Sequence, residues 1–388
     1  MGKEMRKGLI FGAGALGLGF LGPELQQDYS LTYVDIPEKK SLLNWLQKEG
    51  QYVMNETGPA GRAVTVQNVS GAVVSKQKVI NSLLRRSDIV FTAVGASNLN
   101  KVAPTLAEGV SERSVKRPLR VFCCENGIDI AAKCRDYISG EMDEEPGDKL
   151  IVGDTVMGRM CKIVMPPEKG LSPVFPDADW CVVGEPFFGI PVSCYAMEGL
   201  EEPGEAFQVL SEAEFAAQED VKMLAHNGLH AFLAFLGTLR GKEYFCELRE
   251  DLELMSMTGE MMREEVGRAL LRKHGKALNR NFWHNYAPTI TRRITCPGFH
   301  DPVSRGTRGV LRKLQPWERL IGGMRTIWEQ GIEPRLYGIG VAAAVIRAVE
   351  SGETEKTFRQ VLEDHCDLAD EPELVELCLE GRAWCGRE

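Results

Sequence analysis

The sequence predicts an α/β protein, with an N-terminal doubly wound Rossmann-type sheet followed by a mostly α-helical C-terminal domain. Three observations predict this fold. A glycine-rich turn follows an apolar run at the start of the chain, strand-like runs then alternate with helix-compatible segments, and the pattern after about residue 200 is helical. At 388 residues the chain exceeds what one hydrophobic core usually organises, so we expect two domains, 1–200 and 201–388.

The first element is a short apolar strand ahead of a glycine turn, "KGLIFGAGALGLGFLG". Gly12 permits a tight turn, Gly14 lets the backbone approach a pyrophosphate, and Gly17 allows the following helix to pack closely on the strand. The spacing G-x-G-x-x-G predicts a dinucleotide-binding site, although alone it is a weak signal.

The second strand, "SLTYVDI" (30–36), strengthens that prediction because it ends in Asp35. An acid at this position accepts hydrogen bonds from an adenosine ribose 2'-hydroxyl and repels a 2'-phosphate, which favours NAD over NADP. Lys39 and Lys40 follow closely and could weaken this preference.

Four further runs read as strands, at 63–69, 88–95, 119–127 and 149–156. Ligands of such sheets bind outside the carboxyl ends of the strands. The unusual residues fall there, so we predict one cofactor cleft that includes Val94, Gly95, Glu125, Asn126 and Asp154. The proline-rich stretch 164–180 predicts an irregular connection, and 182–197 predicts edge strands.

The helical half contains an unusual stretch, "KMLAHNGLH" (222–230), within a helix that is apolar almost all round. At about 100° per residue, Lys222, His226, Asn227 and His230 share one side of it. Buried polar groups without partners are costly, so we expect a wet cavity or a ligand there. Burial would lower the pKa of Lys222, which makes it a plausible general base, with Asn227 and the histidines as neutral donors.

Two other interpretations of this stretch stay open. His226 and His230 have the spacing of a zinc-binding pair, but the metalloprotease pattern needs Glu where this chain has Asn227, so we predict no metal. Alternatively, Lys222 extends to solvent from a helix start and the histidines are satisfied within a domain interface.

Composition excludes several classes of protein. A net charge of -9 and a pI of about 5.4 argue against a nucleic-acid partner. No apolar run reaches the ~18 residues of a membrane span, and no leader-like segment precedes the first strand, so we expect a cytoplasmic protein. The 11 cysteines show no C-x-x-C pair, which favours reduced thiols. The oligomeric state is not predicted.

The run Lys222-x4-Asn227-x2-His230 resembles the signature of the polyol-specific long-chain dehydrogenases, and "IFGAGALGLGFLG", "FTAVG", "CENG" and "LRKLQPWERLIG" are similar to segments of the same family. The resemblance runs from residue 8 to about 347. It implies a metal-independent enzyme that transfers hydride between NAD and a sugar alcohol or its phosphate.

By position, the resemblance makes Lys222 the general acid/base, Asn227 a donor that polarises the substrate oxygen and His230 a further donor. Asp154, in "GDTVMGR", stands where the mannitol 2-dehydrogenase branch has a second asparagine of the oxyanion site. The chain departs from the family at Gly158-Arg159, where an acid usually precedes the arginine, and at His226, where an apolar residue is expected.

For the substrate, the informative stretch is "SRGTRGVLRKLQPWERL" (304–320), which is basic in an acidic protein. Guanidinium groups suit phosphate or carboxylate oxygens, so we predict Arg308, Arg312 and Lys313 as substrate-binding residues. The expected reaction is interconversion of mannitol 1-phosphate and fructose 6-phosphate. A mannitol 2-dehydrogenase or hexuronate (fructuronate or tagaturonate) reductase, or a nucleotide-sensing protein without turnover, are the alternatives.

Overall fold

A computed structural model describes residues 5–58, 61–127, 129–168, 170–186, 188–201 and 203–386. The chain forms two compact units, Met1–Phe215 and Ala216–Glu388. The division lies later than the boundary near residue 200 expected from the sequence, because strand β12 (Phe207–Leu210) pairs with β11 (Ile190–Ser193) within the first unit. Apart from β12, the described chain after residue 200 contains helices and loops, in line with the sequence pattern.

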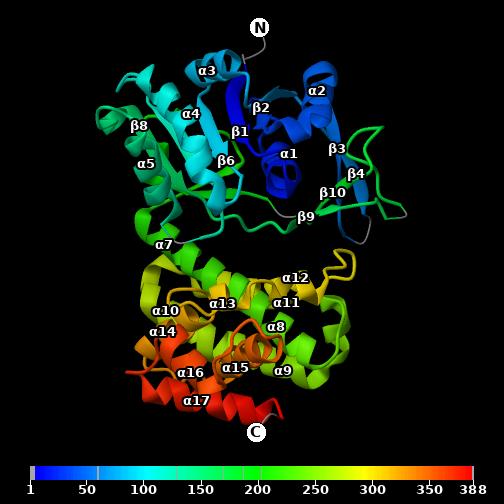
Figure 1. The fold of residues 1–388 in the computed structure, drawn as a ribbon, viewed down its shortest axis with the longest axis vertical. Coiled ribbons are helices and arrows are strands. Elements are labelled where there is room, and N and C mark those ends of the chain that lie inside the picture. Colours follow the sequence, from blue (N-terminus) through cyan, green and yellow to red (C-terminus); the bar gives the residue numbers. More distant parts are fainter. Residues whose placement is uncertain are drawn as a thin grey trace. The chain divides into compact units, whose positions relative to one another are not determined.

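The first unit contains a six-stranded parallel sheet in the order β5-β2-β1-β6-β7-β8 (Figure 1). Counted within this sheet, the order is 3-2-1-4-5-6, which is that of the Rossmann fold. The predicted doubly wound sheet is therefore confirmed. Its strands are β1 (Arg6–Phe11), β2 (Tyr29–Asp35), β5 (Val69–Val73), β6 (Ile89–Thr92), β7 (Leu119–Cys123) and β8 (Leu150–Asp154).

Both faces of this sheet are buried, as parallel sheets require. Side chains alternate along β1, so that Ile10 joins one hydrophobic cluster while Leu9 and Phe11 join the other. Helices α3 (Gln77–Arg86), α4 (Leu99–Ser111) and α5 (Ile130–Gly140) supply the second cluster and cover that face (Figure 1).

A second sheet of four strands has the order β4-β3-β10-β9. Its strands are β3 (Gln51–Glu56), β4 (Arg62–Gln67), β9 (Cys161–Val164) and β10 (Cys181–Gly184). The predicted strand 63–69 was therefore wrong as a single element. Asn68, at a φ of 60°, separates β4, which pairs antiparallel with β3, from β5 of the main sheet. The predicted irregular connection before β10 is present. The edge strands predicted within 182–197 are only partly correct: β11 lies in a two-stranded sheet, but β10 pairs on both sides, with β3 and β9, and residues 194–197 are helical.

The remaining helices of the first unit are short. They are the π-helix η1 (Gly17–Leu21), α1 (Gly22–Leu25), η2 (Pro37–Lys39), α2 (Lys40–Glu49), η3 (Ala96–Asn98), η4 (Gly147–Lys149) and α6 (Cys194–Met197). Helix η1 begins at the last glycine of the predicted cofactor turn, so that turn leads directly into a helix.

The second unit is helical and is built around α15 (Arg335–Glu350), which is buried along most of its length and packs against α8 (Leu229–Leu239) and α17 (Pro372–Trp384). The segment of interest runs through α7 (Glu212–Asp220), η5 (Val221–Gly228) and α8 without interruption. In the described chain, no helix combines the length and apolar character needed to cross a membrane.

The other helices of this unit are η6 (Phe245–Glu250), α9 (Leu252–Glu260), η7 (Met261–Gly267), α10 (Arg268–His274), η8 (Gly275–Ala277), α11 (Arg280–Ile294), α12 (Val303–Thr307), α13 (Val310–Lys313), α14 (Ile321–Glu329), α16 (Phe358–Gln360) and η9 (Val361–His365). Elements α11, α14 and η7 all pack against η5, so the polar stretch lies inside the helical unit.

Candidate active site

The predicted cofactor turn lies where β1 and β6 end side by side in the main sheet. Gly12 has a φ of 112°, and a Cβ on it would lie 2.4 Å from the Ala93 carbonyl oxygen, so only glycine fits. A Cβ on Gly17 would lie 2.1 Å from the Gly12 oxygen, whereas one on Gly14 would meet no atom within 4 Å. The turn thus combines close internal packing with one open backbone position, as a pyrophosphate group requires.

Asp35 is held beside this turn at the end of β2. Its Oδ2 accepts a hydrogen bond of 2.7 Å from the Ala13 amide, and its Oδ1 accepts one of 2.7 Å from the Ile36 amide. The half-buried carboxylate is therefore oriented before any ribose hydroxyl binds. Lys39, which could have attracted a 2'-phosphate, places its Nζ 4.8 Å from the centre of the Trp180 ring.

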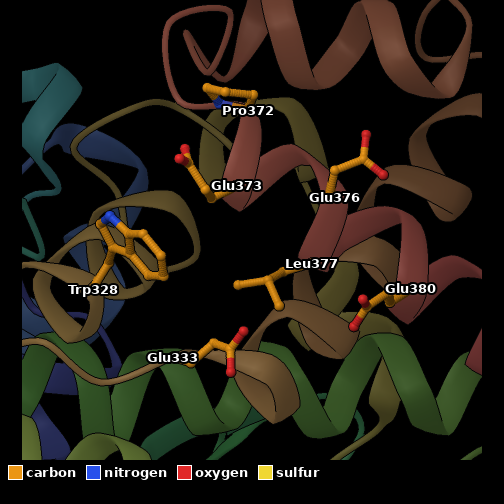
Figure 2. Close-up of a pocket in the computed structure, with 7 residues that line it drawn as sticks. All are labelled: Trp328, Glu333, Pro372, Glu373, Glu376, Leu377 and Glu380. Atoms are coloured by element: carbon orange, nitrogen blue, oxygen red, sulfur yellow. The ribbon is translucent and has the colours of Figure 1, made fainter.

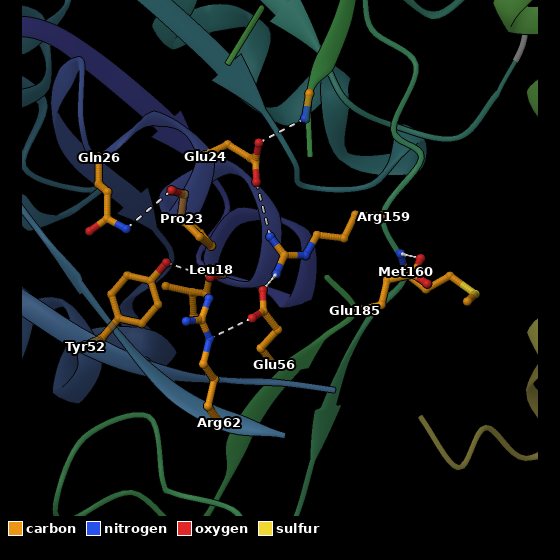
Figure 3. Close-up of polar contacts among 11 residues, drawn as sticks. Leu18, Pro23, Glu24, Gln26, Tyr52, Glu56, Arg62, Arg159, Met160 and Glu185 are labelled. Carbon is orange, nitrogen blue, oxygen red and sulfur yellow. Dashed lines mark hydrogen bonds and ion pairs between the residues drawn. The ribbon is translucent and has the colours of Figure 1, made fainter. Parts of the chain in front are cut away.

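Two buried tyrosines hold the π-helix that follows the glycine turn. The hydroxyl of Tyr33 donates to the Gly17 oxygen at 3.0 Å. That of Tyr52 donates to the Leu18 oxygen at 2.6 Å (Figure 3). The two hydroxyl oxygens are 3.0 Å apart. A π-turn shifts the helical bonding pattern by one residue, so these side chains stabilise carbonyl groups at the irregular site.

Arg159 links the segment after Asp154 to the same region. Its side chain is 1% exposed and lies 3.4 Å from both Glu24 of α1 and Glu56 of β3 (Figure 3). Glu24 also accepts a hydrogen bond of 3.0 Å from the Gly189 amide, while burial raises its pKa. Arg159, which follows Gly158 where the resemblance leads us to expect an acid, is thus part of a buried ion-pair network.

The carboxyl ends of β6 and β7 are joined by Glu125. Its carboxylate accepts hydrogen bonds from the Thr92 hydroxyl at 2.7 Å and the Val94 amide at 2.9 Å. Gly95 has a φ of 88°, and Asn126 is exposed. Among the predicted cofactor residues, Glu125 therefore orders the loop around Val94 and Gly95, while Asn126 presents its side chain to the outside.

Asp154 ends β8 and accepts a hydrogen bond of 2.9 Å from the Ala131 amide in the first turn of α5. Burial raises the pKa of this carboxyl to about 6, and the charges of Asp129 and Glu125 act in the same direction. Asp154 therefore binds a helix N-terminus and is poised to change protonation near neutral pH, which are properties that its sequence position did not predict.

In the helical unit, three members of the predicted polar stripe, Lys222, His226 and Asn227, lie on the π-helix η5 and not on the α-helix that we assumed. The fourth, His230, lies on α8. Each amide of a π-helix bonds five residues back, which places Lys222 and Asn227 one turn apart. Both residues are half-buried, whereas His226 is buried. The structure thus places Lys222, His226 and Asn227 on one segment. Lys222 and Asn227 lie more nearly on the same side of this π-helix than they would on an α-helix.

His230 lies in the first turn of α8 and faces a carboxylate that the sequence analysis missed. Its Nε2 lies 3.4 Å from Asp301 Oδ2, and its ring lies 4.5 Å from that of Phe245. Burial lowers the pKa of His230, while the bond to Asp301 opposes that change. Arg305 Nε lies 2.9 Å from Asp301 Oδ1. In the sequence, the four-residue spacing of Asp301 and Arg305 could have indicated this ion pair, but not the contact of Asp301 with His230.

The three predicted substrate-binding residues do not form a single open anion site. Arg308 is exposed, and Arg312 pairs with Glu318 at 2.6 Å. Lys313 is 5% exposed and donates from Nζ to the Arg308 carbonyl oxygen. Burial lowers the pKa of Lys313 to about 8, with Arg319 and Arg312 contributing. Arg319, with a side chain 13% exposed, shares Glu318 at 3.0 Å.

One cavity of about 430 Å³ in the helical unit is acidic (Figure 2), and its lining residues are Trp328, Glu333, Pro372, Glu373, Glu376, Leu377 and Glu380. The described residues include no group of three or more His, Cys, Asp or Glu side chains arranged to hold a metal ion.

Comparison with known proteins identifies the family. The mannitol dehydrogenase Rossmann domain matches residues 6–152, and the mannitol dehydrogenase C-terminal domain matches residues 215–375. The chain belongs to the mannitol dehydrogenase family. The resemblance seen in the sequence is thereby confirmed.

Curated relatives within the mannitol dehydrogenase family resemble the chain over most of its length. Mannitol-1-phosphate 5-dehydrogenase from Arthrobacter sp. is 30% identical over 356 residues, which cover 90% of this chain and 88% of the relative. The enzyme of the same name from Anoxybacillus flavithermus is 28% identical over 360 residues, or 91% of each chain.

Solved structures show the same fold. Mannitol 2-dehydrogenase from Pseudomonas fluorescens, determined with NAD and D-mannitol, has a TM-score of 0.71 at 15% identity, covering 98% of this chain and 92% of that protein. A substrate-free D-sorbitol dehydrogenase has a TM-score of 0.72 at 14% identity, covering 98% and 93%.

As a member of the mannitol dehydrogenase family, the protein is an oxidoreductase that acts on a polyol, and its cofactor is NAD. The residues of the first unit fit this cofactor. Gly14 leaves the backbone open for a pyrophosphate, and Asp35 presents an oriented carboxylate for a ribose.

Proposed function

We propose that the protein interconverts mannitol 1-phosphate and fructose 6-phosphate. The observation that carries this proposal is the similarity to mannitol-1-phosphate 5-dehydrogenases over about nine tenths of the chain. The π-helical segment adds the chemistry, because it holds an amine and an amide one turn apart in half-buried positions. Lys222, Asn227, His230 and Asp154 are the residues that we assign to catalysis.

In the oxidation direction, the neutral amine of Lys222 takes the proton of the substrate hydroxyl, and the hydrogen on the same carbon leaves as hydride. NAD, when bound, supplies the acceptor for that hydride. Asn227 donates from its side-chain amide to the developing alkoxide, and His230, oriented by Asp301, helps to position the substrate. Ketone reduction reverses each role, with Lys222 returning the proton.

A Lys222→Met variant tests the assignment, because methionine keeps the length of the side chain and removes the amine. We expect kcat/KM for fructose 6-phosphate to fall at least about a hundredfold, which is the lower range for loss of a general acid/base. The dissociation constant for NADH should not change. Lys276→Met, at an exposed position, is the matched control. Normal turnover by the Lys222 variant would disprove the mechanism.

An unphosphorylated polyol or a keto sugar acid is the second candidate substrate. The uncharged polyol is favoured by one observation, namely that Arg312 and Lys313 already contact groups of the protein itself. Turnover of fructose 6-phosphate, fructose, fructuronate and tagaturonate at one NADH concentration separates the candidates. A preference for fructose 6-phosphate of at least tenfold in kcat/KM supports the phosphate, and a preference for any other member excludes it.

Two further expectations belong to this proposal. The enzyme should need no metal, so that full activity remains after dialysis against EDTA. A cytoplasmic location stays a prediction from the N-terminal sequence, and fractionation of cells that express the tagged protein would test it.

A further inference from the structure

His226 is a polar residue on η5 to which the proposed reaction gives no role. It is 4% exposed, and Val221, Leu224 and Ala225 on the same segment are also buried. Within the described residues, its Nδ1 is buried and has no hydrogen-bond partner. An unsatisfied buried polar atom is rare in proteins and requires an explanation.

Three other histidines of the helical unit have a hydrogen-bond partner at Nε2. His274 Nε2 lies 2.7 Å from Asp220, and His365 Nε2 lies 2.7 Å from the Leu311 carbonyl oxygen. His230 faces Asp301. Each of these three rings is held by a carboxylate or a carbonyl group, whereas His226 has a buried ring nitrogen, Nδ1, without such a partner in the described chain.

The surroundings of His226 are cationic. Burial is the largest cause of a pKa far below the usual value for histidine, and Lys222, Arg293, His230 and Arg319 lower that pKa further. The imidazole is therefore neutral at pH 7. A neutral imidazole has one N–H donor and one acceptor nitrogen, which is the combination that a hydroxyl group satisfies in either direction. A phosphate offers acceptors only.

The position along the helix places His226 with the catalytic groups. Lys222 lies four residues before it and Asn227 is its neighbour, all within the π-helical segment. A substrate whose reacting oxygen meets Lys222 and Asn227 therefore has adjacent carbons within reach of the same segment. In a polyol chain, each of those carbons carries a hydroxyl group.

We propose that His226 binds a hydroxyl group of the substrate chain through Nδ1 and thereby acts as a specificity-determining residue for polyols. This inference rests on the proposed function, which places the reacting oxygen at Lys222 and Asn227. In this proposal, the substrate supplies the missing hydrogen-bond partner of Nδ1. The enzyme would then prefer a chain with several hydroxyl groups to a ketone or alcohol that lacks them.

The test compares His226→Leu with His226→Asn. Leucine fills the space without a polar atom, whereas the asparagine amide lies close to the position of Nδ1. With the best substrate of the panel above, we expect His226→Leu to raise KM about ten- to hundredfold, as for one hydrogen bond to a buried group. His226→Asn should stay within about threefold of wild type, and the dissociation constant for NADH should be unchanged in both.

Thermal unfolding without ligands separates a substrate role from a structural one. Removing an unsatisfied buried polar group should leave the melting temperature of His226→Leu equal to or above that of wild type. A lower melting temperature with an unchanged KM would overturn the proposal, as would equal KM values in both variants and wild type. Because the comparison uses whichever panel substrate is turned over, it remains valid if fructose 6-phosphate is not the substrate.

Discussion

Gly22, at the start of α1, provides a sharp test of how the helix after the cofactor turn is held. A Cβ at this position would lie 2.1 Å from the Tyr52 hydroxyl oxygen and 2.3 Å from that of Tyr33. An ordinary contact is about 3.5 Å, so Gly22→Ala forces both hydroxyls to move by about 1 Å. They then lose their bonds to the carbonyl groups of Gly17 and Leu18.

The expected cost combines two effects. Overpacking a filled site costs about 1–3 kcal/mol, and leaving a buried carbonyl without its donor costs about 1–3 kcal/mol. We therefore expect Gly22→Ala to destabilise the first unit by about 2–6 kcal/mol and to weaken NADH binding. Urea unfolding measures the loss of stability. A fluorescence titration of the folded protein with NADH measures the change in binding.

Two further variants make this prediction specific. Gly140→Ala is the matched control, because a Cβ at that helical position meets no atom within 4 Å. Tyr52→Phe removes one of the two clashing oxygens, and the next atom of that ring, Cζ, lies 3.2 Å from the added Cβ. The double variant Gly22→Ala/Tyr52→Phe should therefore be more stable than the sum of the single effects by about 0.5–3 kcal/mol. Additive effects, or a Gly22→Ala variant as stable as Gly140→Ala, would refute the reasoning.

Three other predictions concern buried carboxylates. The pKa of Asp154 is raised from 3.8 to about 6 in the folded protein, so the folded state holds this proton more tightly than the unfolded state does. The free energy of unfolding should therefore decrease as the pH rises from about 4 to 6. In urea titrations over this pH range, Asp154→Asn should make that decrease smaller. Glu265 accepts hydrogen bonds of 2.7 and 2.8 Å from the first amides of α15, so Glu265→Ala should cost about 2–4 kcal/mol, whereas Glu264→Ala at an exposed position should cost under about 0.5 kcal/mol. Asp301→Asn should lower the pKa of His230 further, visible by NMR titration of its ring protons, and reduce kcat/KM about tenfold; an unchanged titration would remove the orienting role of Asp301.

Much of the first unit could be predicted because its signals are local. The spacing of Gly12, Gly14 and Gly17 and the acid at Asp35 follow from the geometry of one strand, one turn and the next strand. Strand 63–69 failed as a prediction because a single residue, Asn68, changes the direction of the chain and divides it between two sheets. Apolar alternation does not reveal that turn.

In the helical unit, the sequence identified the polar residues of η5 but assumed α-helical spacing for them. That segment is a π-helix packed against α11, α14 and η7, and the residue pattern within it did not indicate this change of helix type. The basic stretch 304–320 was a weaker guide, since Glu318 pairs with Arg312 and Arg319 and thus neutralises charges that the sequence alone presents as available.

The sequence by itself determined the cofactor turn, the acid that follows it and the family motif around Lys222, because each depends on residues within one or two neighbouring elements. Tertiary structure alone decided which polar groups are satisfied. Asp301 reaches His230 across 71 residues, and Tyr52 reaches Leu18 across 34, whereas the Nδ1 of His226 has no partner in the described chain. Hydrogen bonds between distant segments depend on packing, and local residue patterns do not encode them.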